Sequence, residues 1–171
     1  MKIIVNEKSL VPNDSWMEFR KVRAIIENQN GEYVISQEGG KIIFPGGKCD
    51  QNEDELSAIK RELKEETGLD FTDEELKQVL TLETFYDDFY DYRSKSLKPR
   101  HTITTYYYTK TDKQIASENL TLTEGEISEN FHIFFINKEG LLNLLNQDHS
   151  DMENGKYFDE ENRIVAQKIL K

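Results

Sequence analysis

Three glutamates, Glu62, Glu65 and Glu66, are the residues whose type and spacing point most directly to chemistry. They stand at positions i, i+3 and i+4, and a helix turns by about 100° per residue, so all three carboxylates would share one side of a helix. Like charges at that spacing repel one another unless a cation lies between them. Because hard divalent cations such as Mg²⁺ and Mn²⁺ prefer oxygen ligands, the pattern predicts a metal site.

Residues just before the three glutamates would support such a site. Glu53 and Arg61 are separated by a little over two helical turns, so their side chains are expected to pair if Glu53 lies at the helix entrance and Arg61 reaches back. Gly46 and Gly47 precede them in the chain. Since glycine has no Cβ, a backbone carbonyl there can face a metal, and a phosphate can approach the backbone closely.

The stretch from Gly47 to Leu69 resembles the Nudix box of the Nudix hydrolases. That box reads Gly, five residues, Glu, seven residues, Arg-Glu, an apolar residue, any residue, Glu-Glu, any residue, Gly and an apolar residue, and every defined position is filled. The segments Phe44–Gly47 before it and Glu124–Ile127 after it are also similar to family segments. Three loop positions depart from the more usual apolar, Glu and Gly residues: Cys49, Asp50 and Asn52.

This resemblance implies a pyrophosphohydrolase that uses Mg²⁺, or Mn²⁺ as a substitute. Such an enzyme directs water onto a phosphorus of a nucleoside diphosphate linked to another group, X, as in a nucleoside triphosphate, ADP-ribose or a dinucleoside polyphosphate. The resemblance places Glu65 and Glu66 on the metal, with the carbonyl of Gly46 and the carboxylate of Glu62 completing the site. A metal would offset the charge of the diphosphate and lower the pKa of the attacking water.

The general base has two candidates, because family members carry it either on the box helix or on a later loop. Glu62 is the first and Glu126 the second. The residues assigned by resemblance are Glu62, Glu66, Glu126 and Arg61 for catalysis, Gly46, Glu62, Glu65 and Glu66 for the metal, and Glu53, Gly47 and Gly68 for structural support.

An aromatic run over residues 85–92 is the first candidate for substrate contact. Strand alternation would place Tyr86 and Phe89 on opposite faces, and core packing and base stacking account for the run equally well. Tyr86 also stands where a tyrosine resembles a marker of dinucleoside polyphosphate hydrolases. The segment 93–100 holds the main basic cluster of an acidic chain, and phosphate binding and plain loop exposure both explain it. The residues assigned to substrate binding are Tyr86, Phe89, Arg93 and Arg100.

Hydrophobic periodicity and turn residues predict the elements that position these groups. A helix is expected over 53–67, with acids in its first turn and Gly68 as a left-handed C-cap. The expected strands cover 17–27, 32–37, 41–44, 81–92, 101–110 and 131–136, with a loop over 93–100, and further helices are expected over 72–80, 137–145 and 162–170. The order predicts one domain over 1–171 of the α/β (α+β) class, with a mixed β-sheet sandwiched between α-helices. The resemblance makes this the Nudix fold.

Composition limits the partners. The 171 residues carry 33 acidic and 22 basic side chains, a net charge of −11, which disfavours binding of duplex nucleic acid. The single cysteine, Cys49, excludes an internal disulfide and indicates a reducing cytoplasm. The apolar run Ile3–Val5 is too short for a signal peptide or a membrane anchor. Because family members often dimerise, the resemblance also implies a homodimer, with a small nucleotide as the main partner.

Two other functions stay open from sequence. One is a nucleotide-sensing module that has the fold without catalysis, although such modules lose carboxylates that are present here. The other is an acidic domain that binds protein partners only. No catalytic role is assigned to Cys49, and the scattered histidines His101, His132 and His149 are expected to be structural or surface residues rather than a zinc site.

Overall fold

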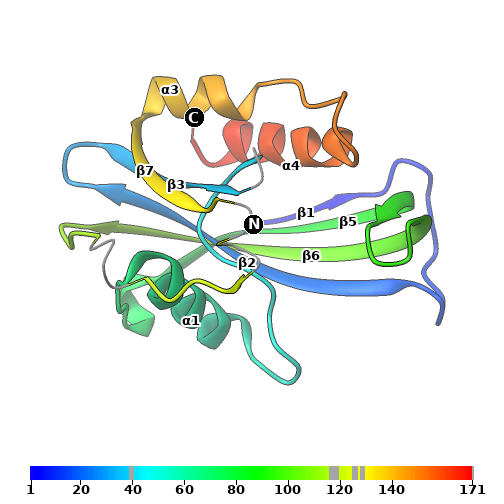
Figure 1. The fold of residues 1–171 in the computed structure, drawn as a ribbon, viewed down its shortest axis with the longest axis horizontal. Helices are drawn as coiled ribbons and strands as arrows, with labels where there is room; N and C mark the ends of the chain where they lie inside the picture. The colour runs from blue at the N-terminus through cyan, green and yellow to red at the C-terminus, as the bar shows by residue number, and fades with distance from the viewer. Residues whose placement is uncertain (39–40, 116–119, 125–126, 128–129, 171) are drawn as a thin grey trace.

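A β-sheet with helices on both faces organises the chain (Figure 1). The computed structural model describes residues 1–38, 41–115, 120–124, 127 and 130–170. Helix α1 (Glu55–Thr67) lies on one face of the sheet, and α3 (Lys138–Leu145) and α4 (Gly155–Lys168) lie on the other. The predicted arrangement, a mixed sheet between helices, is confirmed.

Within the described residues, seven strands form the sheet in the order β1-β5-β6-β2-β3-β4, and β7 pairs with β3 beside this path. The pairs β1–β5 and β2–β6 are parallel, and the remaining pairs are antiparallel, so the sheet is mixed. The strands are β1 Lys2–Val5, β2 Met17–Asn28, β3 Glu32–Glu38, β4 Lys41–Ile43, β5 Lys77–Asp91, β6 Ser96–Thr111 and β7 His132–Asn137.

Both ends of α1 follow from its sequence. Asp54 caps the N-terminus, because its carboxylate accepts hydrogen bonds from the backbone N–H groups of Leu56 and Ser57. Gly68 ends the helix in the left-handed region, with φ at 71°, and its N–H donates to the carbonyl of Lys64. The box therefore forms a loop followed by a helix, and the start and end of that helix are fixed by contacts of Asp54 and Gly68.

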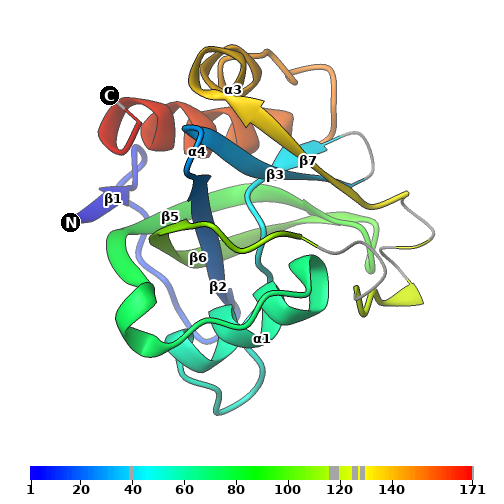
Figure 2. The same ribbon diagram turned by 90° about the vertical axis from the view of Figure 1, so that its left-hand side faces the viewer.

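Strand β2 shows how the sheet separates two apolar cores. Figure 2 shows β2 between α1 on one side and α4 on the other. Val22, Ala24 and Ile26 are buried against α1, whereas Ile25 is buried among residues of α3 and α4. Because side chains alternate along a strand, Lys21 and Arg23 belong to the same face as Ile25. Two basic side chains of β2 therefore point toward the side of α4.

Two predictions around β5 and β6 are wrong. Residues 72–80 do not form a helix. One 3₁₀ turn, Asp73–Glu75, is followed directly by β5, because Leu80 and Leu82 are needed at alternating buried positions of the sheet. Residues 93–100 do not form a long loop either, since the two strands continue to a turn over 92–95. Arg100 is consequently a strand residue, fixed by pairing between β5 and β6.

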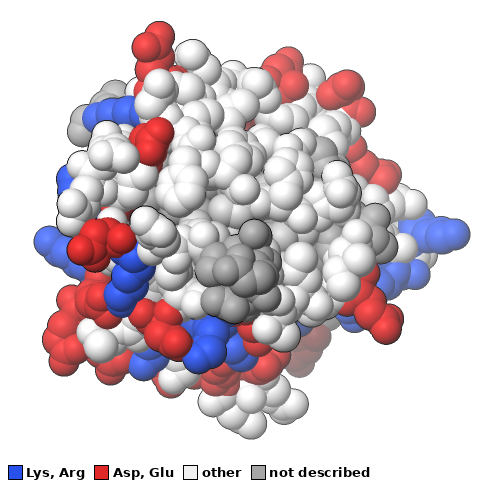
Figure 3. All heavy atoms as spheres, turned by 60° about the vertical axis from the view of Figure 1, so that its left-hand side comes forward, with Lys and Arg blue, Asp and Glu red and all other residues white. Residues whose placement is uncertain are grey.

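Two further elements differ from the prediction. Helix α4 begins at Gly155, seven residues before the expected start, and β1 pairs with β5 as a short parallel edge strand that the sequence pattern did not predict. No helix in the described ranges has the length and apolar character needed to cross a membrane. Figure 3 shows acidic and basic side chains interspersed toward the lower edge of one face, at the height of α1, and few charges at its centre.

Candidate active site

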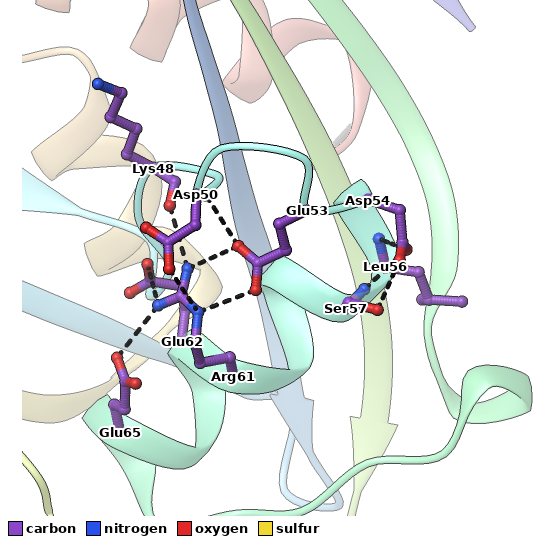
Figure 4. Close-up of polar contacts among 9 residues, drawn as sticks. All are labelled: Lys48, Asp50, Glu53, Asp54, Leu56, Ser57, Arg61, Glu62 and Glu65. Carbon is purple, nitrogen blue, oxygen red and sulfur yellow. Dashed lines mark hydrogen bonds and ion pairs between the residues drawn. The ribbon is translucent and has the colours of Figure 1, made fainter.

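Arg61 lies at the centre of the polar contacts around the box (Figure 4). Its Nε and Nη2 atoms donate to the two carboxylate oxygens of Glu53, each at 2.9 Å. Nη1 donates to Glu62 at 2.8 Å and to Glu65 at 3.3 Å, and Nη2 also donates to the carbonyl of Lys48 at 3.1 Å. Arg61 thus connects the loop, the helix entrance and two of the box carboxylates.

The glycine loop is held against β2 by backbone hydrogen bonds. Val22 N–H donates to the carbonyl of Gly47 at 2.9 Å, and Ala24 N–H donates to the carbonyl of Pro45 at 2.8 Å. Gly46 has φ at 129°, and a Cβ there would overlap the backbone carbonyl of Val22. A Cβ at Gly47 would overlap the carboxylate of Glu62. Glycine is therefore required at both positions: the backbone of Val22 requires it at Gly46, and the side chain of Glu62 requires it at Gly47.

The three box carboxylates differ in burial. Glu66 is 4% exposed and accepts a hydrogen bond from the backbone N–H of Gly46 at 2.8 Å. Glu62 is 9% exposed, and this burial raises the pKa of its carboxyl group, against the opposing effect of the hydrogen bond from Arg61. Glu65 is the most open of the three, with its side chain 35% exposed. The structure brings these carboxylates to one side of α1, next to the glycine loop.

The donor set suits a hard divalent cation. Glu62, Glu65, Glu66 and the carbonyl of Gly46 all offer oxygen, the ligand type that Mg²⁺ and Mn²⁺ prefer. In the present geometry, guanidinium groups lie against several of these atoms, since Arg23 donates to the Gly46 carbonyl and Arg61 donates to Glu62 and Glu65. Within the described ranges, no three His, Cys, Asp or Glu side chains are grouped closely enough to hold a metal ion.

A cavity of about 280 Å³ lies on the other side of β2, between the sheet and α4. Its wall combines aromatic rings with charged groups, including Lys21, Arg100 and Glu161. The cavity and the box meet at β2. Arg23 donates to the carbonyl of Gly46, and its positive charge acts on both Glu62 in the box and Lys21 in the cavity: it opposes the rise in the pKa of Glu62 and adds to the fall in the pKa of Lys21. A ligand bound in this cavity would therefore lie close to the glycine loop.

Helix α4 is attached to the sheet by two adjacent glutamates. The hydroxyl of Tyr86 on β5 donates to Glu160 at 2.9 Å, and the hydroxyl of Tyr106 on β6 donates to Glu161 at 2.5 Å. Burial raises the pKa of both tyrosines, which therefore remain protonated donors. Asn154 adds two hydrogen bonds to the backbone of β5, at 2.8 and 3.0 Å. These contacts fix one wall of the cavity relative to the strands beneath it.

Three of the four predicted substrate residues line this cavity: Tyr86, Phe89 and Arg100. Tyr86 and Phe89 were expected on opposite faces, and that expectation is wrong because the pairing of β5 with β6 shifts between them at an irregularity in the strand. Arg100 lies between two rings, with its guanidinium carbon 4.0 Å from the centroid of Phe19 and 4.1 Å from that of Phe89. Arg93 is exposed in the turn after β5, away from the cavity.

Sequence reasoning missed several charged residues of this region, among them Lys21, Arg23 and Glu161. Lys21 and Arg23 alternate with the buried residues Val22 and Ala24 in β2, which was the available signal. That signal is ambiguous, because the same alternation is typical of a strand with one face in water. Glu161 fell just outside the expected start of the last helix, so its position facing the sheet was not anticipated.

The remaining residues are placed as follows. Glu126 lies outside the described residues. Cys49 is buried, and burial raises the pKa of its thiol, as in an unreactive core cysteine. His101 pairs with Glu83 at 2.9 Å and stacks on Phe85. His149 lines the cavity and is paired through Nδ1 with Asp159 at 2.6 Å, and His132 is exposed on β7.

Comparisons with known proteins give a family and a fold. The family model described as NUDIX domain matches residues 17–154. A MutT protein from Methanosarcina mazei Go1 has a similar structure, with 19% identity and a TM-score of 0.54 over 88% of this chain and 99% of that one. A MutT NUDIX hydrolase from Burkholderia pseudomallei gives 16% identity and a TM-score of 0.56 over 90% of this chain and 98% of that one. An Ap4A hydrolase from C. elegans gives 18% identity and a TM-score of 0.50 over 87% of this chain and 98% of that one. No curated protein sequence matches the chain.

Proposed function

The chain belongs to the Nudix family of hydrolases, which act on pyrophosphate bonds, and we propose that it is a Mg²⁺-dependent enzyme that cleaves a nucleoside diphosphate linked to another group. The observation that carries this proposal is the position of the box carboxylates and the glycine loop across β2 from an aromatic and cationic cavity. A substrate whose nucleoside lies in the cavity would present its phosphates toward the box.

In this proposal, Glu65 and Glu66 hold the cation, together with the carbonyl of Gly46 and the carboxylate of Glu62. When bound, a divalent cation supplies charge neutralisation of the diphosphate and activation of a water molecule. Glu66 is positioned by the N–H of Gly46, and Arg61 orients Glu62 and Glu65 from the opposite side. Glu53 holds Arg61 in place through both of its carboxylate oxygens.

Glu62 is the proposed general base, with Glu126 as the second candidate. Three features support Glu62: its side chain is nearly buried, it faces Gly47 closely enough to exclude a Cβ there, and Arg61 fixes its orientation. A proton-accepting oxygen must lie within hydrogen-bond reach of the attacking water, and the glycine loop leaves room for that water and a phosphate.

The proposed substrates are a nucleoside triphosphate, ADP-ribose or a dinucleoside polyphosphate. Rings from β5 and α4, including Phe89 and Phe158, line the cavity and offer stacking surfaces for a nucleobase. MutT proteins and an Ap4A hydrolase are among the similar structures, which agrees with a nucleotide substrate without choosing between these classes.

The experiment is an assay of product release from nucleoside triphosphates, ADP-ribose, nucleotide sugars and dinucleoside polyphosphates, with Mg²⁺, with Mn²⁺ and without metal. The Glu66→Gln variant is assayed in parallel. Selective metal-dependent turnover by the native chain and its loss in the variant would support the proposal. Absence of turnover across the panel, together with an increase in melting temperature on adding nucleotides, would contradict it and favour a nucleotide-sensing module.

A further inference from the structure

The cavity contains three basic side chains that form no ion pair with a described residue, and Glu161 is the carboxylate of its wall that acts on two of them, Lys21 and Arg100. Lys21, Lys41 and Arg100 all line it, and among the side chains that the structure describes none of the three forms an ion pair. Exposed lysines of the same protein, such as Lys110 and Lys156, do have carboxylate partners. A cavity in an acidic chain that is lined by three cations without ion-pair partners among the described residues provides a site for an anion.

Lys21 is the most confined of these cations. Burial lowers the pKa of its ammonium to about 8, against the raising effect of the Glu161 charge and together with the smaller lowering effects of Arg23, Arg100 and Lys41. The carboxylate of Glu161 is already engaged by the hydroxyl of Tyr106. Glu153, the other acidic residue of the cavity wall, accepts a hydrogen bond from the hydroxyl of Tyr92 through its backbone carbonyl. Lys21 therefore faces like charges that a bound anion would compensate.

Arg100 is also held in an orientation that suits the binding of an anion. Its guanidinium plane lies between the rings of Phe19 and Phe89, so both of its faces are covered. Nε donates to Thr102 at 3.0 Å, and the two terminal nitrogens have no carboxylate partner among the described residues. A guanidinium covered on both faces binds a ligand through its edge, where its N–H groups match the oxygens of a phosphate.

The position of Arg100 separates it from the box. In the register of β2 and β6, Arg100 is opposite Met17, whereas Val22, which receives the glycine loop, is opposite Thr105. Five residues of strand correspond to roughly 16 Å. An anion held by Arg100 is therefore distinct from a phosphate lying on the glycine loop. Lys21, opposite Thr104, lies nearer to that loop. The guanidinium of Arg100 nevertheless lies over Phe19, two residues before Lys21 on the same face of β2, and its charge acts on Lys21.

We propose that Lys21 and Arg100 form a subsite for a phosphate monoester of the substrate, separate from the pyrophosphate that is cleaved. Lys21, Lys41 and Arg100, set against the carboxylate of Glu161, leave two positive charges. A phosphate monoester carries close to two negative charges at neutral pH and matches this excess, whereas a carboxylate would leave one charge uncompensated. This inference rests on the proposed function, because it concerns the substrate of the same site. It predicts substrates that carry an additional terminal, 2′- or 3′-phosphate.

The first test measures binding without catalysis. Calorimetry on metal-free protein compares AMP with adenosine 2′,5′-bisphosphate and adenosine 3′,5′-bisphosphate, which differ from it by one phosphate. We expect at least one bisphosphate to bind ten-fold or more tightly than AMP. In Lys21→Met and Arg100→Gln, the affinity of the bisphosphate should fall to within two-fold of that of AMP. Arg100→Lys should keep part of the preference for the bisphosphate. Lys77→Met, which changes an exposed lysine on β5, should keep all of it. Equal binding of all three nucleotides by the native protein would overturn the inference.

The second test measures hydrolysis of matched substrate pairs, NADPH with NADH and coenzyme A with dephospho-coenzyme A. We expect a preference in kcat/KM for the phosphorylated member of at least one pair, and a smaller preference in Lys21→Met. If the variant lowers kcat/KM equally for both members of each pair, Lys21 serves the cleaved pyrophosphate and the inference is wrong. If the native chain hydrolyses no nucleotide but the bisphosphate preference is present, the proposed function fails while the subsite stands.

Discussion

Arg61 donates two parallel hydrogen bonds to the carboxylate of Glu53, one from Nε and one from Nη2, each 2.9 Å long. This bidentate pair joins Glu53, at the end of the loop, to the second turn of the box helix. The charged hydrogen bonds lower the pKa of Glu53 and raise the pKa of Arg61. The loop is consequently fixed to the same helix that carries Glu62, Glu65 and Glu66.

Replacing Glu53 by glutamine tests the stabilising effect of this pair. We expect the free energy of unfolding at pH 7 to fall by about 1–3 kcal/mol. Because the folded-state pKa of Glu53 is lowered, its contribution is fully present above the unfolded pKa of about 4.3 and is lost as the pH falls through the folded value. Urea unfolding of both proteins at pH 7 and near pH 3 measures this. A difference that does not shrink at the lower pH would contradict the prediction.

Glu66→Gln should separate catalysis from folding. The amide oxygen of glutamine can still accept the hydrogen bond from Gly46 N–H, so the melting temperature should change by only a few degrees. Loss of the negative charge should lower metal-dependent kcat/KM by at least about 100-fold. Steady-state kinetics over a Mg²⁺ titration measures the effect. Native-like turnover at saturating Mg²⁺ would exclude a role for the Glu66 charge.

Lys21→Met should stabilise the ligand-free protein. The folded-state pKa of Lys21 is about 8 against 10.5 in the unfolded chain, so its protonation is a cost to folding that is fully present below pH 8 and disappears as the pH rises past 10.5. We expect a gain in the free energy of unfolding of up to about 3 kcal/mol at pH 7 and a smaller gain near pH 10.5. Urea unfolding at both pH values is the measurement, with Lys77→Met as the matched control. A loss of stability at pH 7 would refute this account of Lys21.

Two glycine substitutions should have contrasting effects. In Gly46→Ala, the new Cβ meets the backbone carbonyl of Val22 at a left-handed φ, and neither can move easily, so we expect a loss of about 2 kcal/mol or more. In Gly47→Ala, the new Cβ meets the carboxylate of Glu62, which can rotate away. The second variant should therefore keep more of its stability and lose activity. Thermal unfolding and kcat/KM are measured for both variants. Equal losses of stability would contradict the prediction, because they would show that the side chain of Glu62 cannot move away from the new Cβ.

Much of the box was predictable because its geometry is local. The N-cap, the helix, the left-handed Gly68 and the pairing of Glu53 with Arg61 depend on residues within a few turns of one another. Spacing along one helix is enough to predict such contacts.

The cavity was not predictable in the same way, because it depends on contacts between distant segments. Tyr86 and Phe89 share a wall only because the β5–β6 pairing shifts between them, and a regular alternation gives the wrong face. In the sequence, Lys21 and Arg23 have the pattern of a strand with one face in water. In the structure, Lys21 lies in a cavity that residues of α4 help to line. Arg100 had the pattern of a loop residue, because the length of the β5–β6 hairpin was underestimated.

The two tyrosine contacts of α4 determine more than its distance from the sheet. Glu160 and Glu161 are consecutive residues, so their side chains leave the helix about 100° apart. They reach hydroxyl groups on two different strands, β5 and β6. Both hydrogen bonds are satisfied at one rotational setting of the helix about its own axis, and a turn in either direction breaks at least one of them. Helix α4 is therefore fixed in rotation, and the side chains that it presents to the cavity, Phe158 among them, keep a constant orientation toward a ligand.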